Sequence, residues 1–507
     1  MNRNGDVQTE KDETKIDVVE NSIGVLGRWH IWICFLIFLS KLPIAWVQLH
    51  IVFAAPPVTV SCIDNITDHC SANCTGYVYD RSLFTETIIT QWNLVCENSH
   101  LGSFAQTVTM LGIMVGNLLF GTLADKFGRR MPLVLAIIVQ IISGTVQAFA
   151  PWFWLFLVCR FICSVATGGT MVTTFVLVME LIGTKWRTAV GILYQIPFNL
   201  GHLSLTLIGY LIRDWRYFQL TITLPSIILL SYYWVIPESP RWLLATGQTE
   251  EAIVVMEKAA RSNGLPTDAI KENVILSTQK NTTTENKKGR ILDLVRTSNM
   301  RIKTFSICFN WIVCGLCFFG GAQYMGQLGG NIFVNVALSA VIQIPGTLIS
   351  VWLTKTLGRK YTLIGADILA GLSFIIIGLV PADVEWAKIL LGTLGMFGLS
   401  VCFPTVYIYS GELYPTVIRN IGVGTSSMCA RIGSMLAPFV AGLSSVEPWI
   451  APTIFGAIPL IGAALCYHLP ETLDCKLPET LEDAELFGKK VKKDKDKIPT
   501  VEVLELK

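Results

Sequence analysis

The sequence predicts an all-α membrane protein with twelve transmembrane helices in two pseudo-symmetric six-helix halves. Three observations lead to this fold class. Only 15% of the 507 residues are charged and 52% are hydrophobic, whereas soluble domains carry about 25% charged residues. The apolar residues also come in runs of about 20, the length that a helix needs to cross a ~30 Å hydrocarbon core. Finally, several polar segments of the first half recur in the second half.

The apolar runs define the predicted organisation of the chain. The twelve predicted spans lie near residues 29–49, 101–120, 132–150, 153–179, 188–210, 217–236, 303–322, 332–353, 361–380, 386–409, 421–443 and 449–469. We therefore expect a cytoplasmic N-terminus (1–28), an N-terminal half (29–236) with an extracellular loop (50–100), a cytoplasmic linker (237–302), a C-terminal half (303–469) and a cytoplasmic tail (470–507).

Basic residues in the loops predict the orientation, because Lys and Arg mark the cytoplasmic side of a membrane. The loop between spans two and three holds Lys126, Arg129 and Arg130, and the linker and tail are also basic. The loop between spans one and two holds only Arg81. Both termini are therefore predicted to be cytoplasmic.

The loop over residues 50–100 carries independent signals of an extracellular location. It contains four cysteines, Cys62, Cys70, Cys74 and Cys96, and two glycosylation sequons, at Asn65 and Asn73. Disulfides and N-glycans both form on the extracellular side, which agrees with the loop charges. Four cysteines allow three pairings, and the sequence does not choose among them.

An internal repeat relates the two halves. The segment 123–133 reappears as 353–363, about 230 residues later. Glu180 followed by Arg187 recurs at the same separation as Glu412 followed by Arg419, and Pro-Glu-Ser at 237–239 recurs as Pro-Glu-Thr at 470–472. Matches at nearly one offset and in one order indicate two repeated structural units, as in carriers whose halves are related by an axis along the membrane normal.

The segment 121–130, Gly-Thr-Leu-Ala-Asp-Lys-Phe-Gly-Arg-Arg, resembles the signature loop of the major facilitator superfamily. Three further segments, 91–96, 237–244 and 412–420, resemble the organic cation, organic anion and carnitine transporters, solute carrier family 22. This resemblance implies the major facilitator fold and an alternating-access carrier for small organic ions in the plasma membrane. It also implies that Asp125 and the neighbouring arginines latch the two halves in one state.

Arg431, inside span eleven, is the main candidate for substrate recognition, since a charge in a membrane span is costly and usually functional. In the resemblance, the anion and carnitine branches have Arg here and the cation branch has Asp. A guanidinium binds a carboxylate through two parallel hydrogen bonds, which favours zwitterionic or anionic substrates such as carnitine-like or carboxylate-bearing molecules. Lys41 is a second positive candidate. Thr347 stands where the anion branch commonly has a basic residue, which leaves zwitterions and cations open.

Aromatic and amide side chains complete the predicted substrate site, because ring faces attract desolvated ammonium groups and amides supply directional hydrogen bonds. These candidates are Tyr194, Tyr233, Trp311, Gln195 and Gln343. Two alternatives remain open. Arg431 could be structural in a cation carrier, or the chain could be a non-transporting receptor or scaffold on the same fold.

Charged residues near the ends of the spans, together with Arg160 inside span four, are predicted to act as conformational latches rather than as substrate contacts. These are Asp125, Arg129, Arg130, Arg160, Glu180, Arg187, Arg359, Glu412 and Arg419. The sequence shows no phosphate-binding loop and no hydrolase or metalloprotease motif, so we expect no enzyme activity, cofactor or metal. The net charge of +2, without a basic aromatic stretch, argues against a nucleic-acid partner. The expected partners are an organic ion and the lipid bilayer, and the sequence does not identify a co-transported ion.

Overall fold

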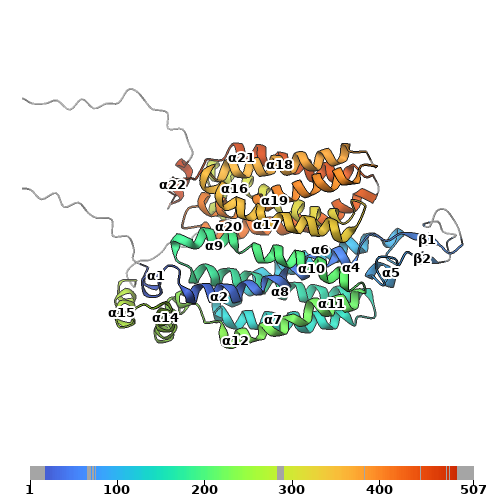
Figure 1. Cartoon of the computed structure of the whole chain (residues 1–507). Coiled ribbons are helices and arrows are strands. Elements are labelled where there is room, and N and C mark those ends of the chain that lie inside the picture. Colours follow the sequence, from blue (N-terminus) through green and yellow to red (C-terminus); the bar gives the residue numbers. More distant parts are fainter. Residues whose placement is uncertain are drawn as a thin grey trace, which may run out of the picture.

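Two helical bundles lie side by side in the computed structural model, and their long helices run nearly parallel (Figure 1). The structure describes residues 17–64, 70, 74, 76–281, 290–381, 383–445, 447–475, 477–478 and 480–487. One bundle is built from the N-terminal half of the chain and the other from the C-terminal half, which confirms the predicted fold class.

The N-terminal bundle follows the predicted order of spans. Its elements are α2 (Arg28–Leu39), α3 (Lys41–Leu49), α4 (Ile51–Ala54), α6 (His100–Phe127), α7 (Arg130–Ala148), α8 (Phe153–Leu181), α9 (Thr184–Leu193), α10 (Ile196–Leu211), α11 (Trp215–Thr223), η2 (Leu224–Ser231) and α12 (Tyr232–Val235). The first span is formed by α2 to α4, the fifth by α9 and α10, and the sixth by α11 to α12.

The C-terminal bundle has longer, less interrupted helices. They are α16 (Ser298–Met325), α17 (Ile332–Thr356), α18 (Arg359–Leu379), α19 (Glu385–Leu413), α20 (Arg419–Gly442) with the short η4 (Leu443–Ser445), and α21 (Ile450–Tyr467). Ten helical segments of the described chain are long and apolar enough to cross a membrane. The two other predicted spans are also helical: the fifth is divided between α9 and α10, and α20 is less apolar.

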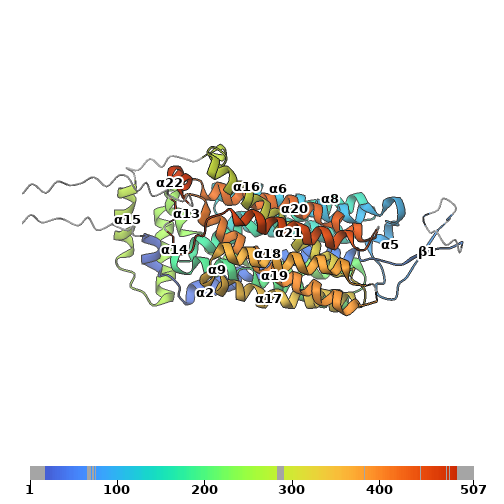
Figure 2. The same cartoon turned by 90° about the horizontal axis from the view of Figure 1, so that it is seen from above.

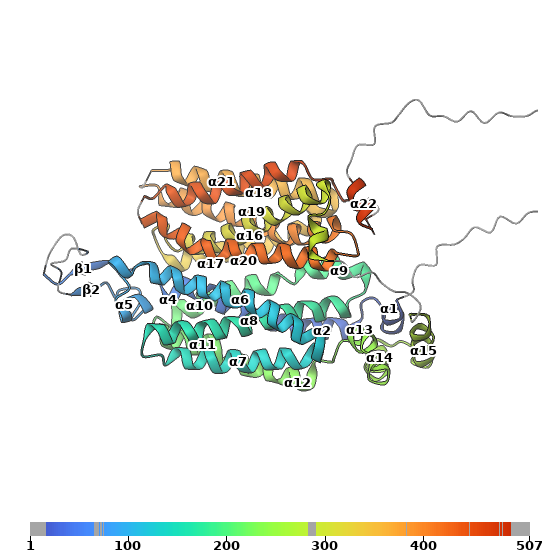
Figure 3. The ribbon, with the colours of Figure 1, turned by 180° about the vertical axis from the view of Figure 1, so that it is seen from behind.

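Short elements gather at the two ends of the bundles (Figure 2 and Figure 3). At one end, here called the linker end, lie α1 (Val18–Ile23), α13 (Pro240–Ala245), α14 (Thr249–Asn263), α15 (Ile270–Asn281), η3 (Ile291–Leu294) and α22 (Leu481–Leu486). At the opposite end, the loop end, lie β1 (Val60–Cys62), β2 (Tyr77–Tyr79), α5 (Ile88–Trp92) and η1 (Cys96–Asn98). Both described chain ends are therefore at the linker end.

The loop end carries the disulfides. Cys62 pairs with Cys74, and Cys70 pairs with Cys96, which selects one of the three pairings that the sequence left open. The first disulfide closes a short segment next to β1, and β1 pairs with β2 in antiparallel register from Val60 opposite Tyr79. The predicted glycosylation sites, Asn65 and Asn73, lie outside the described residues.

Close helix packing in the N-terminal bundle depends on glycine. A Cβ on Gly112 would lie 2.7 Å from the Cβ of Ser164, and one on Gly116 would overlap the carbonyl group of Val165. These contacts join α6 to α8 with almost no side chain between them, because small residues allow helix backbones to approach closely. This pair of helices forms one closely packed wall of the N-terminal bundle.

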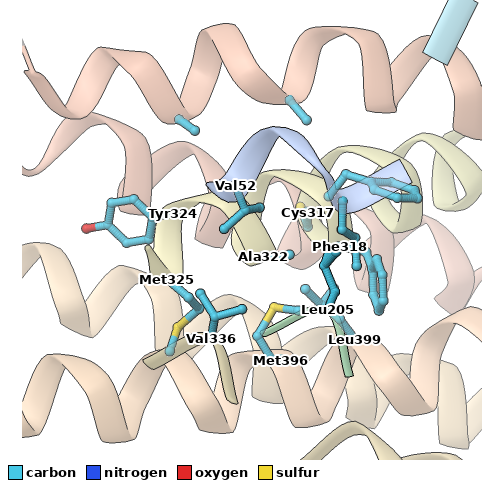
Figure 4. Close-up of a cluster of buried hydrophobic side chains, with 14 of the residues drawn as sticks. Val52, Leu205, Cys317, Phe318, Ala322, Tyr324, Met325, Val336, Met396 and Leu399 are labelled. Atoms are coloured by element: carbon cyan, nitrogen blue, oxygen red, sulfur yellow. The ribbon is translucent and has the colours of Figure 1, made fainter. Parts of the chain in front are cut away.

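A large hydrophobic cluster fills the space between the bundles toward the loop end. Figure 4 shows Val52 and Leu205 of the N-terminal half beside Phe318, Met396 and Leu399 of the C-terminal half. Helices α6 and α20 are also joined there, since the hydroxyl of Thr107 donates to the Met435 carbonyl at 2.8 Å and that of Ser103 donates to the Pro438 carbonyl at 3.3 Å. The two halves are therefore closed together at the loop end.

Candidate substrate cavity

A cavity of about 730 Å³ lies between the two bundles, on the linker side of this hydrophobic cluster. Its volume is in the range of sites that hold small organic molecules. Residues of α3, α6, α8, α9, α10, α16, α19 and α20 line it, and its lining continues to Arg187, Arg419 and Leu477 at the linker end. The cavity is therefore accessible from the linker end and closed at the loop end.

Two basic side chains lie deep in this cavity. Arg431 of α20 is 7% exposed and Lys41 of α3 is 5% exposed. The Arg431 guanidinium donates to the Met171 sulfur at 3.5 Å, and the Lys41 ammonium lies 3.9 Å from the ring centroid of Tyr194. Within the described part of the chain, neither side chain belongs to an ion pair. These two buried basic side chains therefore lack a carboxylate partner, since Glu412, which also lines the cavity, is paired with Arg359.

Aromatic rings form much of the remaining wall. Trp311 of α16 and Tyr407 of α19 meet with ring centroids 4.6 Å apart, and Phe175 of α8 lies 5.5 Å from both Tyr194 and Tyr407. Trp311 donates its indole N–H to the hydroxyl of Ser410 at 2.8 Å. Sequence reasoning missed Phe175 and Tyr407, because one aromatic residue among many in an apolar helix gives no sign of which face it occupies.

Local chain geometry explains how the fifth span contributes to this wall. Tyr194 and Gln195 lie where α9 ends and α10 begins, and Pro197 occupies the first turn of α10. Proline lacks the backbone N–H that a continuous helix would use and fits best in a first turn. The hydroxyl groups of Tyr194 and Thr174 share a hydrogen bond of 2.7 Å, which orients the ring beneath Lys41. The expectation that Tyr194, Gln195 and Trp311 line one cavity agrees with this arrangement.

Two residues predicted for the substrate site lie elsewhere, which corrects the expectation for both. Tyr233 is 41% exposed on α12, where its ring lies 5.5 Å from the Arg130 guanidinium. Gln343 is buried between α17 and α10, where its amide nitrogen lies 3.3 Å from Nδ1 of His202. A polar residue within a span can either line a cavity or form a contact between helices, and the sequence does not show which of the two positions it occupies.

The N-terminal half has a charge cluster at the linker end. The Arg129 guanidinium contacts Asp125 at 2.8 Å and binds Glu180 through two nitrogens, at 2.7 and 3.1 Å. Burial opposes the charged form of Arg129, but hydrogen bonds and attraction from Glu180 and Asp125 raise its pKa above the ordinary value. Glu238, which sequence reasoning noticed only as part of a repeat, accepts the backbone N–H groups of Arg129 and Arg130 at 2.6 and 3.1 Å.

The C-terminal half repeats this cluster almost group for group. Arg359 binds Glu412 at 2.8 Å, and the Glu471 carboxylate accepts the backbone N–H groups of Arg359 and Lys360 at 2.9 and 3.0 Å. Each glutamate thereby satisfies the free N–H groups at the start of a helix, where negative charge is favoured. Gly358, at φ 89°, permits the close approach of Glu471, as a residue with a Cβ would overlap that carboxylate.

These contacts correct several details of the predicted latches. Each cluster lies within one half, and no ion pair among the described residues joins the two halves. The repeated Glu and Arg residues are not partners of each other, since Arg187 donates to the Ile182 carbonyl at 3.4 Å and Arg419 donates to the Tyr414 carbonyl at 3.3 Å.

Arg160, predicted as a latch inside span four, lies within α8, away from the linker end. It is 2% exposed inside the N-terminal bundle. One guanidinium nitrogen lies 2.8 Å from Nδ1 of His50, and another donates to the Ala105 carbonyl at 3.2 Å. These contacts join the first, second and fourth spans, so that Arg160 is a buried cross-link of the bundle in this conformation.

Comparison with known proteins identifies the family. The family described as "Sugar (and other) transporter" matches residues 60–484. The chain is 37% identical to an organic cation transporter protein of Drosophila melanogaster, over 82% of this chain and 77% of that protein. It is 36% identical to solute carrier family 22 member 6 of Danio rerio, over 82% and 74% of the two chains.

A solved structure, the inward-open conformation of the xylose transporter XylE from E. coli, superposes with a TM-score of 0.65 at 18% sequence identity, covering 90% of this chain and 99% of that one. This likeness supports the fold. The relatives are carriers, which confirms the expectation of a transporter rather than an enzyme. From its family match, its relatives and its two-bundle fold, this chain belongs to the major facilitator transporters of the solute carrier family 22 type.

Proposed function

We propose that this carrier moves small organic ions that bear a carboxylate, either anions or zwitterions, across the plasma membrane by alternating access. One observation carries the proposal: Arg431 and Lys41 lie buried in one cavity without an acidic partner. Burying an unpaired charge is costly, and two like charges in one cavity also repel each other. A substrate carboxylate would offset both costs while it is bound.

The aromatic wall supports an organic rather than an inorganic substrate. Trp311, Tyr407 and Phe175 present ring faces and edges to a cavity large enough for a molecule with a hydrocarbon or aromatic body. Burial of such a body stabilises the complex by about 25 cal/mol for each Å² removed from water. For a zwitterion, the same rings would attract the positive group, while Arg431 binds the carboxylate.

The closed loop end and the accessible linker end support an alternating-access cycle with both termini in the cytoplasm. In this orientation the structure is open to the cytoplasm and closed to the outside. We infer that the return to the outward-facing state separates the α6–α20 contact and brings the linker ends of the halves together. The clusters around Arg129 and Arg359 would then exchange some contacts within a half for contacts between the halves.

A cation carrier is the second candidate, and the aromatic wall together with the relative named as an organic cation transporter favours it. The contact of the Lys41 ammonium with the Tyr194 ring supports a wall that accepts a positive group. In that case Arg431 would be structural, held by the contact with Met171. A receptor or scaffold would bind the same solutes without accumulating them.

The test is uptake by the full chain reconstituted in lipid vesicles. Three radiolabelled solutes with one common aromatic body should be compared: one carries a carboxylate, one a quaternary ammonium, and one both groups. We expect saturable accumulation of the carboxylate and the zwitterion, and weak uptake of the pure cation. Uptake of the cation alone would favour the second candidate, and binding of all three solutes without accumulation would favour the receptor.

A further inference from the structure

A buried carboxyl group lies behind the wall of the cavity, within the C-terminal bundle. Asp367, in the middle of α18, is 0% exposed. Its Oδ1 accepts the thiol of Cys402 at 3.1 Å, and its Oδ2 has no hydrogen-bond partner among the described residues. No basic side chain of the described residues forms an ion pair with Asp367. A carboxylate in this position would be an unpaired charge in the membrane interior, where such charges are strongly disfavoured.

A second unpartnered acceptor lies beside Asp367. The amide oxygen of Asn310, on α16, is buried and has no hydrogen-bond partner in the part of the chain that the structure describes. A Cβ built on Gly462 of α21 would lie 3.1 Å from this oxygen and 3.4 Å from Oδ2 of Asp367. Two acceptor oxygens therefore approach the same point in an apolar surrounding. Acceptors cannot satisfy each other, so these two oxygens are satisfied only if one group carries a proton or if a separate donor or cation joins them.

The orientation of the Asn310 amide follows from its other contacts. Its nitrogen donates to the carbonyl of Ser306 at 2.8 Å and to that of Gly462 at 3.4 Å. Turning the amide over would place its oxygen against these two carbonyl acceptors. The amide nitrogen of Asn310 therefore donates to these two carbonyls, and its amide oxygen points toward Asp367.

The repeat of the two halves shows that the fold does not require an acid here. The offset that aligns 123–133 with 353–363 places Asp367 opposite Ile137 of α7. Ile137 is buried at 1% exposure and packs in the hydrophobic core of its own half. A side chain without charge or hydrogen bonds thus fills the equivalent place, which points to a specific use for the carboxyl group in the C-terminal half.

The other titratable groups around Asp367 are thiols. Cys314 and Cys317 come from α16, Cys402 from α19 and Cys466 from α21, and all four are buried. Helix α17 has only Lys355, which is exposed near its linker end. On α18 itself, Lys360 donates to the carbonyl of Tyr467 at 2.7 Å. None of these groups supplies a counter-charge at the site itself.

We propose that Asp367 is a proton-binding site of this carrier, neutral in the inward-facing conformation, with the amide oxygen of Asn310 as the acceptor that faces its acidic proton. Deprotonation would leave a carboxylate facing that oxygen and would disturb the contact between α16, α18 and α21. Asn310 precedes Trp311 and Cys402 precedes Phe403, and both aromatic residues line the cavity. The two residues that contact or approach Asp367 therefore each directly precede a cavity-lining residue, one on α16 and one on α19.

The site can be tested without measuring transport, so that its failure is distinct from failure of the proposed function. The full chain is purified, and its infrared spectrum near neutral pH is recorded for the C=O stretching band of a protonated carboxylic acid, with exchange into heavy water to identify the band. We expect the parent and Asp268→Asn, which changes an exposed acid in the linker, to show the band and Asp367→Asn to lose it. A parent without the band, or a band that persists in Asp367→Asn, would overturn the proposal.

Folding provides a second measurement. Asparagine has the size of a neutral aspartic acid and can donate its amide N–H to Asn310, so Asp367→Asn should unfold at or above the temperature of the parent. Failure of this variant to fold would contradict the proposal, because it would show that the negative charge is required. Thermal stabilisation of the parent by sodium chloride but not by an equal concentration of N-methylglucamine chloride, absent in Asp367→Asn, would instead assign the site to a metal cation and overturn the proton.

Discussion

Replacement of Arg431 by methionine is the most direct perturbation of the cavity. Methionine keeps an unbranched side chain of similar length and removes the guanidinium. Among the described residues, the Arg431 side chain makes one hydrogen bond, to the Met171 sulfur, and no ion pair. The substitution therefore leaves no stranded acidic partner, and the protein should fold and reach the membrane.

The expected size of the effect follows from the contact that is lost. A hydrogen bond to a charged group contributes about 1.5–3 kcal/mol, so the affinity for a carboxylate-bearing substrate should fall roughly 10- to 150-fold. Arg431→Lys keeps the charge but loses the planar pair of donors, so its loss should be smaller. For a pure cation the sign reverses, because removal of a positive charge from the cavity lowers the repulsion on that solute.

Lys41 supplies an internal check, since it lies in the same cavity. If both side chains bind one carboxylate, the losses in Arg431→Met and Lys41→Met should not add in the double variant, as is usual for groups that share a partner. The assay is the concentration dependence of uptake for one carboxylate-bearing solute and one cation, corrected for surface expression. Lys355→Met, which removes an exposed charge outside the cavity, is the control. Unchanged handling of both solutes by Arg431→Met would show that Arg431 is structural and would refute the reasoning.

Three further predictions concern packing, the charge cluster and topology. Gly116→Ala should destabilise the protein by about 1–3 kcal/mol, the usual cost of overpacking. Gly121→Ala on the same helix is the control and should be neutral, because its added Cβ meets nothing within 4 Å. Equal unfolding temperatures of the two variants would contradict the close packing of α6 on α8. Glu180→Gln should lower the stability of the protein more than Asp125→Asn, because the Asp125 side chain is 78% exposed and that of Glu180 only 20%, and exposed ion pairs contribute little. Thermal unfolding of the two variants measures the difference. A larger loss of stability in Asp125→Asn would contradict this expectation. An epitope tag after Gln91 should stain intact cells, and staining only after permeabilisation would reverse the proposed orientation.

Much of the fold could be predicted from particular residues. The repeated segments 123–133 and 353–363 predicted two related halves, and the structure shows matching clusters around Arg129 and Arg359. The partners within these clusters could not be predicted. Glu180 is near Arg187 in the sequence, yet it binds Arg129, which lies between α6 and α7. The packing of α8 against α7 decides which arginine Glu180 contacts.

The substrate cavity could be predicted only in part, for a related reason. Charge within an apolar span is rare enough to identify Arg431 and Lys41, and both lie in the cavity. Aromatic and amide side chains are common in spans, and their role depends on the helix face that they occupy. Tyr233 faces outward, Gln343 faces α10, and the unpredicted Tyr407 completes the cavity wall.

The sequence by itself determined that this chain crosses the membrane many times and that basic residues such as Arg431 and Lys41 lie within the spans, because both conclusions follow from the cost of placing polar groups in hydrocarbon. The repeated segments determined that the two halves are related. Only the tertiary structure decided which cysteines pair, which end of the cavity is closed, and that the side chains of Asp367 and Asn310 both approach Gly462 of α21. These features depend on contacts between residues far apart in the chain. The rotation of each helix about its axis determines such contacts, and for helices that are apolar on nearly every face the sequence pattern leaves that rotation undetermined.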